Sequence, residues 1–489
     1  MSERRYKMGA DRRQSMLMPP SIEEYVSETN VVRAIDAYVE SLDVVRLGFV
    51  LSESGGEKGG QPAYPPEMLF KLYLYGYQNK IRSSRCLERE ARRNIELMWL
   101  LQRLQPSHMT IANFRKNNLQ ALKNASRDFV RLCHEMDLFG GEEVGVDGSF
   151  MRGNASKASI HTKKKLERQQ PKIEQEIEKY LAELEQNDQR ERDVPTEDAE
   201  LAQKIEKLRA RQAKNKARLE KITESGETQI SETDADARLL KKNDKVVAGY
   251  NVQIAVDKKH KLICAHDVVN DGNDSQQLAP MALKAKEALE VETLEVDADG
   301  SYVNALQIKE CLDNGITPYV PLADKESSVR RAGRFVRSEF IYQPETNCYQ
   351  CPAGKQLNFV GIQKKGDKRM QKYASKASDC KNCSLNTKCL PKKTKYRQLY
   401  RWEHEHIIEQ HRQRMEEFGR EHMKTRGNLA EHPFGTLKTE LGWRHFLMRG
   451  LEKVRAEMDL QVLCYNFKRV LNIIGITEFK IQLKQRVMA

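Results

Sequence analysis

The chain has 489 residues, with 83 lysines and arginines against 70 aspartates and glutamates, and therefore a formal net charge of +13. This length exceeds what a single hydrophobic core organises, so we expect several domains. The positive charge favours a polyanionic partner such as nucleic acid, without separating DNA from RNA. No apolar run is long enough to cross a bilayer or to serve as a signal peptide, which excludes a membrane protein and favours the cytoplasm.

The N-terminal part of the chain carries apolar residues at helical spacing, as in "YPPEMLFKLYLYGYQ", and few strand-like runs, which predicts an all-helical domain. Within it, "PSHMTIANFRKNN" predicts a turn at Pro106 and Ser107, a helix cap at Thr110, and a short helix that carries Arg115 and Lys116. This pattern suits a helix-turn-helix in which the two basic residues contact DNA. An ordinary pair of helices in a bundle fits the same residues.

The character of the chain changes at "EEVGVDGSFM", which predicts a buried strand that ends at Asp147 and Gly148. Residues 162–223 then interrupt the β pattern with a densely charged stretch that lacks glycine and cysteine. Apolar residues recur there at helical spacing on both sides of Pro195, which predicts two helices paired as a hairpin. The hairpin could be a solvated spacer, or it could contribute to dimerisation or DNA contact.

The β pattern resumes at "KVVAGYNVQIAVDKKHKLICAHDVV", which predicts an antiparallel hairpin around "DKKHK". A helix over 275–290, a strand in "TLEVDADGSY", a further helix and a strand in "ITPYVPL" follow. Asp297 and Asp299 fall on one face at the end of the first of these strands. This order predicts a mixed sheet flanked by helices, with carboxylates at the strand ends.

A helix near the C-terminus contains "LAEHPFGTLKTELGWRHF", in which Glu431 and Lys438 share a face two turns apart. Pro433 and Gly435 oppose a regular helix at this place. Asn428 could cap a helix that has Glu431 at its third position, and Pro433 would then favour a kink. Local rules are often broken at functional sites, although a kinked surface helix with a solvated glutamate fits as well.

Asp147, Asp299 and Glu431 lie far apart in the sequence, but the fold could bring them together. Three converging carboxylates repel one another unless a cation binds them, and Mg²⁺ or Mn²⁺ prefers such oxygen ligands. Two such ions could support in-line phosphoryl transfer. Glycine-rich loops of the kind that bind nucleotide phosphates are absent, so no nucleotide cofactor is expected.

Four segments together resemble the DDE transposases of bacterial insertion sequences, whose catalytic domain has a ribonuclease-H-like fold. They are "VGVDGSFMRGNAS", "GYNVQIAVD", "DADGSYVNALQIKECLDNGITPYVP" and "EHPFGTLKTELGWRHFLMRGLEKVRAEMDLQVLCYNFKRVLNI". The helical N-terminal part, through "HMTIANFRK", is similar to the domain that precedes the catalytic core in many of these enzymes.

The resemblance implies that Asp147, Asp299 and Glu431 are the three catalytic metal ligands. It also implies that Lys438 contacts DNA near the cut. Arg426 is the nearest match for the arginine that precedes the glutamate, although it stands one residue further away than is common. Asp297 remains a rival to Asp299, because the glycine in "ADGSY" comes one place earlier than in the usual motif.

Cysteine pairs point to a second metal site. They are Cys348 and Cys351, then Cys380 and Cys383. Two CxxC units suit a structural zinc ion held by four thiolates. Reduced cysteines without metal are the alternative, and Cys389 is left without a role.

The predicted architecture is an α/β core, a ribonuclease-H-like mixed sheet flanked by helices, with an all-α N-terminal domain, a helical-hairpin insertion and a small cysteine-rich module. The predicted parts are residues 1–140 (helical, DNA-binding), 141–161 (first part of the core), 162–240 (hairpin insertion), 241–325 (second part of the core), 326–400 (cysteine-rich, zinc-ribbon-like) and 401–489 (C-terminal helices of the core).

The predicted function is that of a DNA transposase, which cuts at the terminal inverted repeats of its element and joins the ends to target DNA. Its expected partners are double-stranded DNA and at least one further copy of the chain, at the bacterial nucleoid. The alternatives are a nuclease of the same fold that does not join strands, and a DNA-binding regulator derived from a transposase. The presence of all three acidic residues argues against the regulator.

Overall fold

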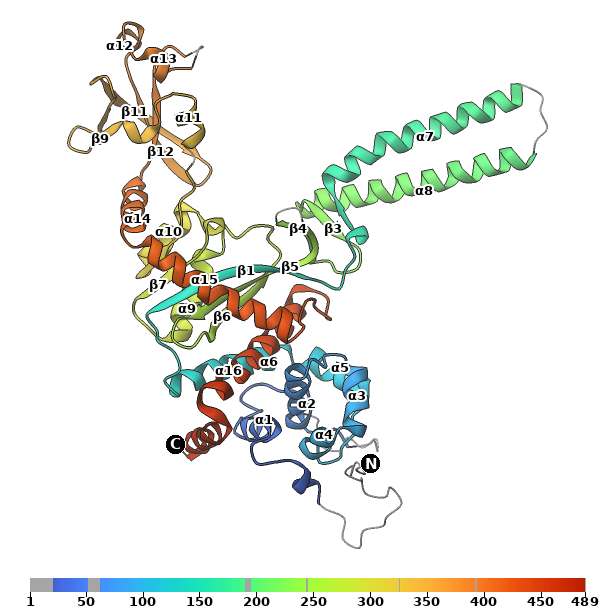
Figure 1. Ribbon diagram of the computed structural model, residues 1–489. Coiled ribbons are helices and arrows are strands. Elements are labelled where there is room, and N and C mark those ends of the chain that lie inside the picture. Colours follow the sequence, from blue (N-terminus) through green and yellow to red (C-terminus); the bar gives the residue numbers. More distant parts are fainter. Residues whose placement is uncertain are drawn as a thin grey trace, which may run out of the picture. The chain divides into compact units, whose positions relative to one another are not determined.

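The computed structural model describes residues 21–51, 62–189, 195–242, 245–324, 326–391 and 394–488 (Figure 1). The basic N-terminal segment, in which no signal peptide was expected, lies outside the described residues. The chain forms two compact units. The first comprises Met1–Gly140, Gly148–Gly272 and Glu431–Ala489, and the second comprises Gly141–Asp147 and Asn273–Ala430. No helix in the described residues is long and apolar enough to cross a membrane.

The first unit contains the N-terminal helices and a long C-terminal helical segment that is interrupted at Gly475. They are α1 (Val31–Glu40), α2 (Pro66–Gln78), α3 (Ser84–Arg93), α4 (Ile95–Leu100), α5 (His108–Asn117), α6 (Leu119–Glu135) and α16 (Leu451–Met488). Helix α16 packs against α1, α2 and α6, and its Phe467 ring lies beside Tyr38 and Phe129. The predicted helical N-terminal region is therefore confirmed, and its core includes residues from the other end of the chain.

Helix α5 begins differently from the prediction. Ser107 is its N-cap, and the Ser107 hydroxyl accepts a hydrogen bond from the Thr110 backbone N–H at 3.2 Å. The predicted cap at Thr110 was wrong, because Thr110 is already in the first turn. Both hydroxyl residues are good caps, and only the backbone conformation decides between them.

The sheet of the first unit is built on the strand β5 (Lys245–Asp257). It pairs antiparallel with β4 (Arg238–Lys242) and with β6 (Ile263–Val269), which confirms the predicted hairpin around "DKKHK". The strand β1 (Glu143–Arg152) joins β5 near Arg152, where only a glycine fits at position 249: a Cβ there would lie 2.0 Å from the Met151 carbonyl oxygen.

The charged stretch forms two long helices that lie side by side, α7 (Lys163–Gln189) and α8 (Pro195–Ser225) (Figure 1). Their contact is apolar and is made by Ile173, Ile177 and Ile205, with Tyr180, Leu184 and Leu208 around them. The pair starts and ends at a short antiparallel ribbon of β2 (Ile160–Thr162) and β3 (Gln229–Ser231). Its apolar stripe is thus covered within the pair.

The second unit contains the parallel part of the mixed sheet. The first residues of β1 pair in parallel with β7 (Leu294–Asp297), which pairs in parallel with β8 (Ile316–Tyr319). Helix α10 (Ala305–Asp313) connects β7 to β8, as a parallel pair requires, and α9 (Leu278–Leu289) precedes β7 and packs against α10. Strand β7 ends at Asp297, whereas β1 continues to Arg152. The predicted end of this strand at Asp147 and Gly148 was therefore wrong, because β1 goes on to join β5.

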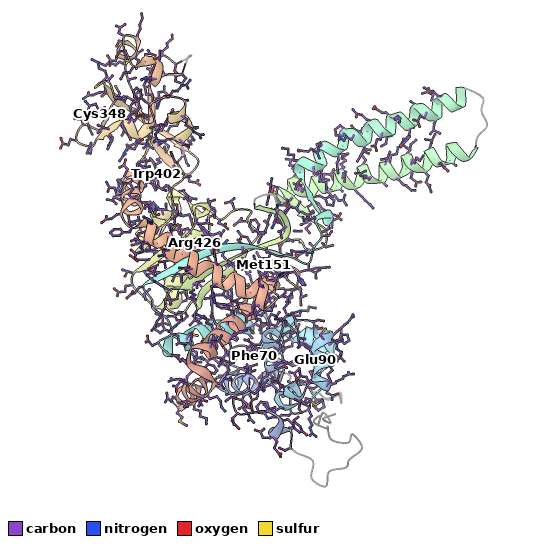
Figure 2. All side chains as sticks on the ribbon, in the orientation of Figure 1. Phe70, Glu90, Met151, Cys348, Trp402 and Arg426 are labelled. Atoms are coloured by element: carbon purple, nitrogen blue, oxygen red, sulfur yellow. The ribbon has the colours of Figure 1, made fainter. Side chains whose placement is uncertain are left out.

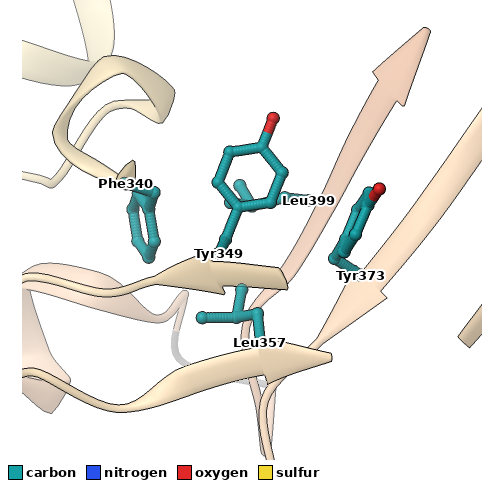
Figure 3. Packing of buried hydrophobic residues seen from close by; sticks show 5 residues of the cluster. All are labelled: Phe340, Tyr349, Leu357, Tyr373 and Leu399. Carbon is teal, nitrogen blue, oxygen red and sulfur yellow. The ribbon is translucent and has the colours of Figure 1, made fainter. Parts of the chain in front are cut away.

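A separate antiparallel sheet follows in the same unit, in the strand order β13-β12-β11-β10-β9. Its strands are β9 (Ile341–Gln343), β10 (Cys348–Gln350), β11 (Gln356–Lys365), β12 (Lys368–Ala374) and β13 (Gln398–Trp402), accompanied by the short helices α11 (Ser327–Arg331), α12 (Ala377–Lys381) and α13 (Asn386–Cys389). Figure 3 shows its core, which consists of Phe340, Tyr349, Leu357, Tyr373 and Leu399. Helices α14 (Glu405–Glu417) and α15 (Gly419–Gly435) come next.

Candidate active site

Two aspartates meet where the parallel pairing of β1 with β7 ends. The register pairs Gly145 with Asp297, so Asp147 and Asp299 stand equally far beyond that pair. A single guanidinium nitrogen of Arg426 donates to Asp147 Oδ1 at 2.9 Å and to Asp299 Oδ2 at 3.5 Å. The two carboxylates are therefore immediate neighbours, with one cation between them. Arg426 is labelled on α15 in Figure 2.

Helix α15 supplies this arginine and starts earlier than the sequence suggested. It begins at Gly419, so Asn428 lies inside the helix, and the predicted cap at Asn428 was wrong. Pro433 also lies inside α15, and a π-helical turn over Thr436–Glu440 follows it. A kink was expected at Pro433, and the helix instead becomes irregular a few residues later, in this π-helical turn. π-Helical turns are rare and often occur at functional sites.

A glycine allows α15 to approach β1 closely. A Cβ placed on Gly145 would lie 3.1 Å from the Cβ of Leu429 on the helix, which is tighter than ordinary packing. Leu429 itself is 2% exposed. The absence of a side chain at position 145 therefore helps to set the distance between the helix that carries Arg426 and the strand that carries Asp147.

A second acidic group lies one turn earlier along α15. Its partner on the helix is His422, whereas Arg426 is the partner of Asp147 and Asp299. His422 Nδ1 is 2.8 Å from Asp297 Oδ1 and 4.0 Å from Glu143 Oε1. The imidazole stacks on the Tyr319 ring with centroids 3.4 Å apart and planes 8° from parallel. Among the described residues, these two carboxylates and this imidazole form a group that could hold a metal ion, with one ligand atom of each within 4.8 Å of the others.

The motifs in the sequence did not mark Glu143, His422 or Asp274 as residues of this site. The Ser301 backbone N–H donates to Asp299 Oδ1 at 2.7 Å, and the Ser301 hydroxyl lies within hydrogen-bond distance of both Asp299 and Asp274, at 3.1 Å from the latter. Burial raises the pKa of the Tyr302 phenol well above its usual value, and the charges of Asp274, Asp147 and Asp299 add to this effect. One sequence signal for Glu143 was available: it stands four residues before Asp147, so the two side chains lie on the same face of the strand.

Glu431 and Lys438 belong to the first unit. Glu431 is exposed on α15, five residues after Arg426. The Lys438 ammonium contacts the Ser149 hydroxyl and lies 5.3 Å from the centre of the Phe434 ring. Lys438 is thus held over an aromatic face, beside a residue that follows Asp147 by two positions.

The two basic residues predicted to contact DNA on α5 differ in exposure. Arg115 is 9% exposed, donates to the Tyr77 hydroxyl at 3.1 Å and lies over the Tyr73 ring. Lys116 is exposed. The burial of Arg115 argues against its predicted DNA contact, because its guanidinium is used inside the helical core.

The five cysteines of the 326–400 region fall into two groups. Cys348 is 2% exposed on β10, whereas the other four line one cavity of about 30 Å³, namely Cys351, Cys380, Cys383 and Cys389. Burial raises the pKa of the Cys389 thiol, and the other three cysteines of the cavity add to this effect while Arg397 opposes it.

Two family models match the chain, one described as a transposase domain (DUF772) over residues 20–117 and one described as a transposase DDE domain over residues 350–471. No curated protein matches. Among solved structures, the cryo-EM structure of a piggyBac transposase synaptic complex with hairpin DNA is 9% identical, with a TM-score of 0.33 over 95% of this chain and 80% of that chain. The two family matches identify transposase domains in the chain and support its assignment to the DDE transposases of insertion sequences.

Proposed function

We propose that this transposase cuts at the ends of its element and joins them to target DNA by metal-dependent phosphoryl transfer, with Asp147, Asp299 and Glu431 as the catalytic carboxylates. The observation that carries the proposal is the convergence of Asp147 and Asp299 on the guanidinium of Arg426. Glu431 enters through the resemblance of "EHPFGTLK" to the third acidic motif of the family, and it is exposed.

The exposure of the carboxylates favours Asp299 over Asp297 as the second ligand. The side chains of Asp147 and Asp299 are 16% and 30% exposed, whereas that of Asp297 is completely buried. Mg²⁺ usually keeps several water ligands and binds substrate phosphate, so its site must be open. The carboxylates beside Arg426 fit this requirement. The buried group of Glu143, Asp297 and His422 suits a structural role better.

Divalent ions bound to these carboxylates would activate the attacking hydroxyl or water and stabilise the leaving oxygen. The chain itself positions the ligands: Ser301 holds the Asp299 carboxylate, and Asp274 holds Ser301. Arg426 balances the charge of the aspartate pair. Lys438 would bind a DNA phosphate as a point charge.

We further propose that the mixed sheet and its helices form a ribonuclease-H-like core. The parallel strands β1, β7 and β8 with α9 and α10, and the antiparallel β4, β5 and β6, support this assignment. The net charge of +13 suits binding to element ends and target DNA. Synapsis of two ends calls for at least a dimer.

The test is cleavage of a labelled duplex that carries the element's own end, in Mg²⁺ and in Ca²⁺. We expect the unmodified protein in Mg²⁺ to leave a nick with a 3′ hydroxyl and to join it to a plasmid. Asp147→Asn, Asp299→Asn and Glu431→Gln should each lower the rate at least about 100-fold without loss of end binding. Glu421→Gln, at an exposed position on the same helix, is the matched control.

Nicking without joined products would instead indicate a nuclease. Full activity of Asp299→Asn together with inactivity of Asp297→Asn, at equal fold stability, would move the second ligand to Asp297. End binding without cleavage by any version of the protein would favour the regulator.

A further inference from the structure

We propose that the antiparallel sheet module of this transposase holds a zinc ion through Cys351, Cys380, Cys383 and Cys389, and that Cys348 is not a ligand. The four cysteines come from three places: the turn after β10, helix α12 with the residues behind it, and the end of α13. All four line the same cavity of about 30 Å³. This set replaces Cys348 of the sequence-based prediction with Cys389.

The alternation of side chains along β10 separates Cys348 from Cys351. In a strand, residues three apart point to opposite faces. Cys351, just past β10, packs with Tyr349 against the apolar core of the sheet. Cys348 lies opposite Gln343 of β9, donates to its side-chain oxygen at 3.3 Å, and lies 3.1 Å from the Thr346 hydroxyl. Cys348 therefore does not line the cavity that Cys351 lines.

The turn after β10 prepares the sulfur of Cys351 as a ligand. The Lys355 backbone N–H donates to Cys351 Sγ at 3.3 Å, and the Cys351 and Lys355 backbones are joined by a further hydrogen bond of 2.8 Å. Gly354 has φ +75°, which a glycine adopts without strain. A donor that points at the sulfur favours the thiolate form, which is the form that binds metal.

The short helices present the other three sulfurs to the same cavity. The Ser375 hydroxyl lies 3.1 Å from Cys380 Sγ, and the Asn386 side chain donates to the Cys380 carbonyl at 2.5 Å. Arg397 donates to the Cys389 carbonyl at 3.0 Å. Such second contacts orient metal ligands. Cys389 also packs against the apolar core beside Cys351.

Four thiolates around one small cavity match structural zinc, which is tetrahedral with Zn–S distances of about 2.3 Å. In the described part of the chain, no three of these sulfurs lie mutually within 4.8 Å. Zinc binding would therefore turn the cysteine side chains inward, and each has a single such torsion to adjust. The ion would tie α12 and α13 to the turn after β10, in a module whose core contains few residues.

The test compares matched serine variants of the full chain. We expect about one zinc per chain by elemental analysis, and an intense thiolate-to-metal absorption band after exchange with Co²⁺. Cys389→Ser should weaken zinc binding at least about tenfold and diminish the band, whereas Cys348→Ser should keep both. Zinc retained by Cys389→Ser but lost from Cys348→Ser would overturn the proposal, as would a chain that binds no zinc after reduction and reconstitution.

A second measurement needs no variant and covers the case in which Cys348→Ser fails to fold. Brief alkylation of the unmodified protein, mapped by mass spectrometry with and without a chelator, reports which thiols the metal protects. The four proposed ligands should become reactive together when zinc is removed, and Cys348 should change less. Equal reactivity of Cys389 in the two conditions would exclude it from the site.

Discussion

Asp297 and Asp299 stand two residues apart, yet their carboxylates contact different partners. Asp297 is the last residue of β7, is completely buried and lies against His422, whereas Asp299 caps the short helix Gly300–Tyr302 and faces Arg426. Helix α15 supplies both partners, since His422 and Arg426 are four residues apart and share a face. Through these two side chains, α15 contacts Asp297 in a buried group and Asp299 in a more open one.

This division predicts opposite effects of two similar substitutions. Asp297→Asn removes a buried charge that His422 contacts at 2.8 Å, so we expect the free energy of unfolding to fall by about 1–3 kcal/mol. Asp299→Asn changes a partly exposed carboxylate and should cost less than about 0.5 kcal/mol. Urea unfolding of the two variants beside the unmodified protein measures the difference. The prediction fails if Asp299→Asn is the more destabilising of the two.

At this scale, the sequence correctly suggested that Asp147 and Asp299 could meet, although only Asp299 follows the end of its strand and Asp147 lies within β1. It did not reveal Glu143 and His422. Their contact depends on where α15 lies along the sheet, and that position follows from the packing of Leu429 over Gly145. No short sequence pattern encodes such a long-range approach.

Helix α14 is held to the end of β8 by a buried histidine. His411 is completely buried, and its Nε2 lies 2.9 Å from the Val320 carbonyl oxygen. The Arg414 guanidinium lies 3.1 Å from His411 Nδ1 and also donates to the Pro318 carbonyl. The imidazole is therefore neutral, with Nε2 donating and Nδ1 accepting. Protonation would place a positive charge against Arg414.

Burial lowers the pKa of His411 below its usual value of about 6.5, and Arg414 adds to the effect. The unfolded chain binds a proton at this histidine more readily than the folded chain does. The contribution of the neutral His411 imidazole to the free energy of unfolding is thus fully present above about pH 6.5. It declines as the pH falls below this value, by up to about 1.4 kcal/mol per pH unit.

His411→Gln should remove this contribution while keeping a side-chain N–H for Val320. We expect the unmodified protein to lose more thermal stability than the variant between about pH 7 and about pH 5.5. The reason is that position 411 carries a titrating group in the unmodified protein and none in the variant. Thermal unfolding followed by circular dichroism at several pH values measures this. Parallel pH profiles for the two proteins would show that His411 does not titrate on unfolding.

Regular elements were the most predictable level of the structure. The hairpin of β5 and β6 and the N-terminal helices follow from the period of their apolar residues. The start of α15 could not be read in the same way, because Asn428 and Glu431 form a good capping pattern inside a longer helix. Tertiary packing outweighed this local preference. The cysteines illustrate the same limit, because their spacing favoured Cys348, which does not line the cavity that the other four cysteines share.

At the scale of the whole molecule, the net charge favoured a polyanionic partner such as nucleic acid, and the resemblance to DDE transposases agrees with the family matches. The family matches lie over residues 20–117 for the transposase domain and over residues 350–471 for the DDE domain. Composition could not show that the C-terminal helix α16 completes the core of the N-terminal helices. Such pairing of distant segments requires the folded structure.

The helical hairpin of α7 and α8 provides a further test at this scale. Its apolar residues are covered within the pair, and residues 163–228 contain 16 basic and 16 acidic side chains, so the segment has no net charge. Neither feature favours a DNA contact or a large interface with another copy. We therefore expect the hairpin to be dispensable both for folding and for electrostatic binding to DNA.

The register of the β2–β3 pair shows where the helical hairpin can be removed without disturbing the strands. Thr162 pairs directly with Gln229, so an Asn-Gly turn can replace residues 163–228 and close a two-residue hairpin. The shortened chain should keep its thermal stability, its oligomeric state by light scattering, and the slope of log affinity against log salt for the element end. Lys438→Ala should lower the magnitude of that slope by about one and serves as the positive control. A shallower salt dependence of the shortened chain would show that the hairpin binds DNA phosphates, and dissociation into monomers would show that it forms the interface between copies.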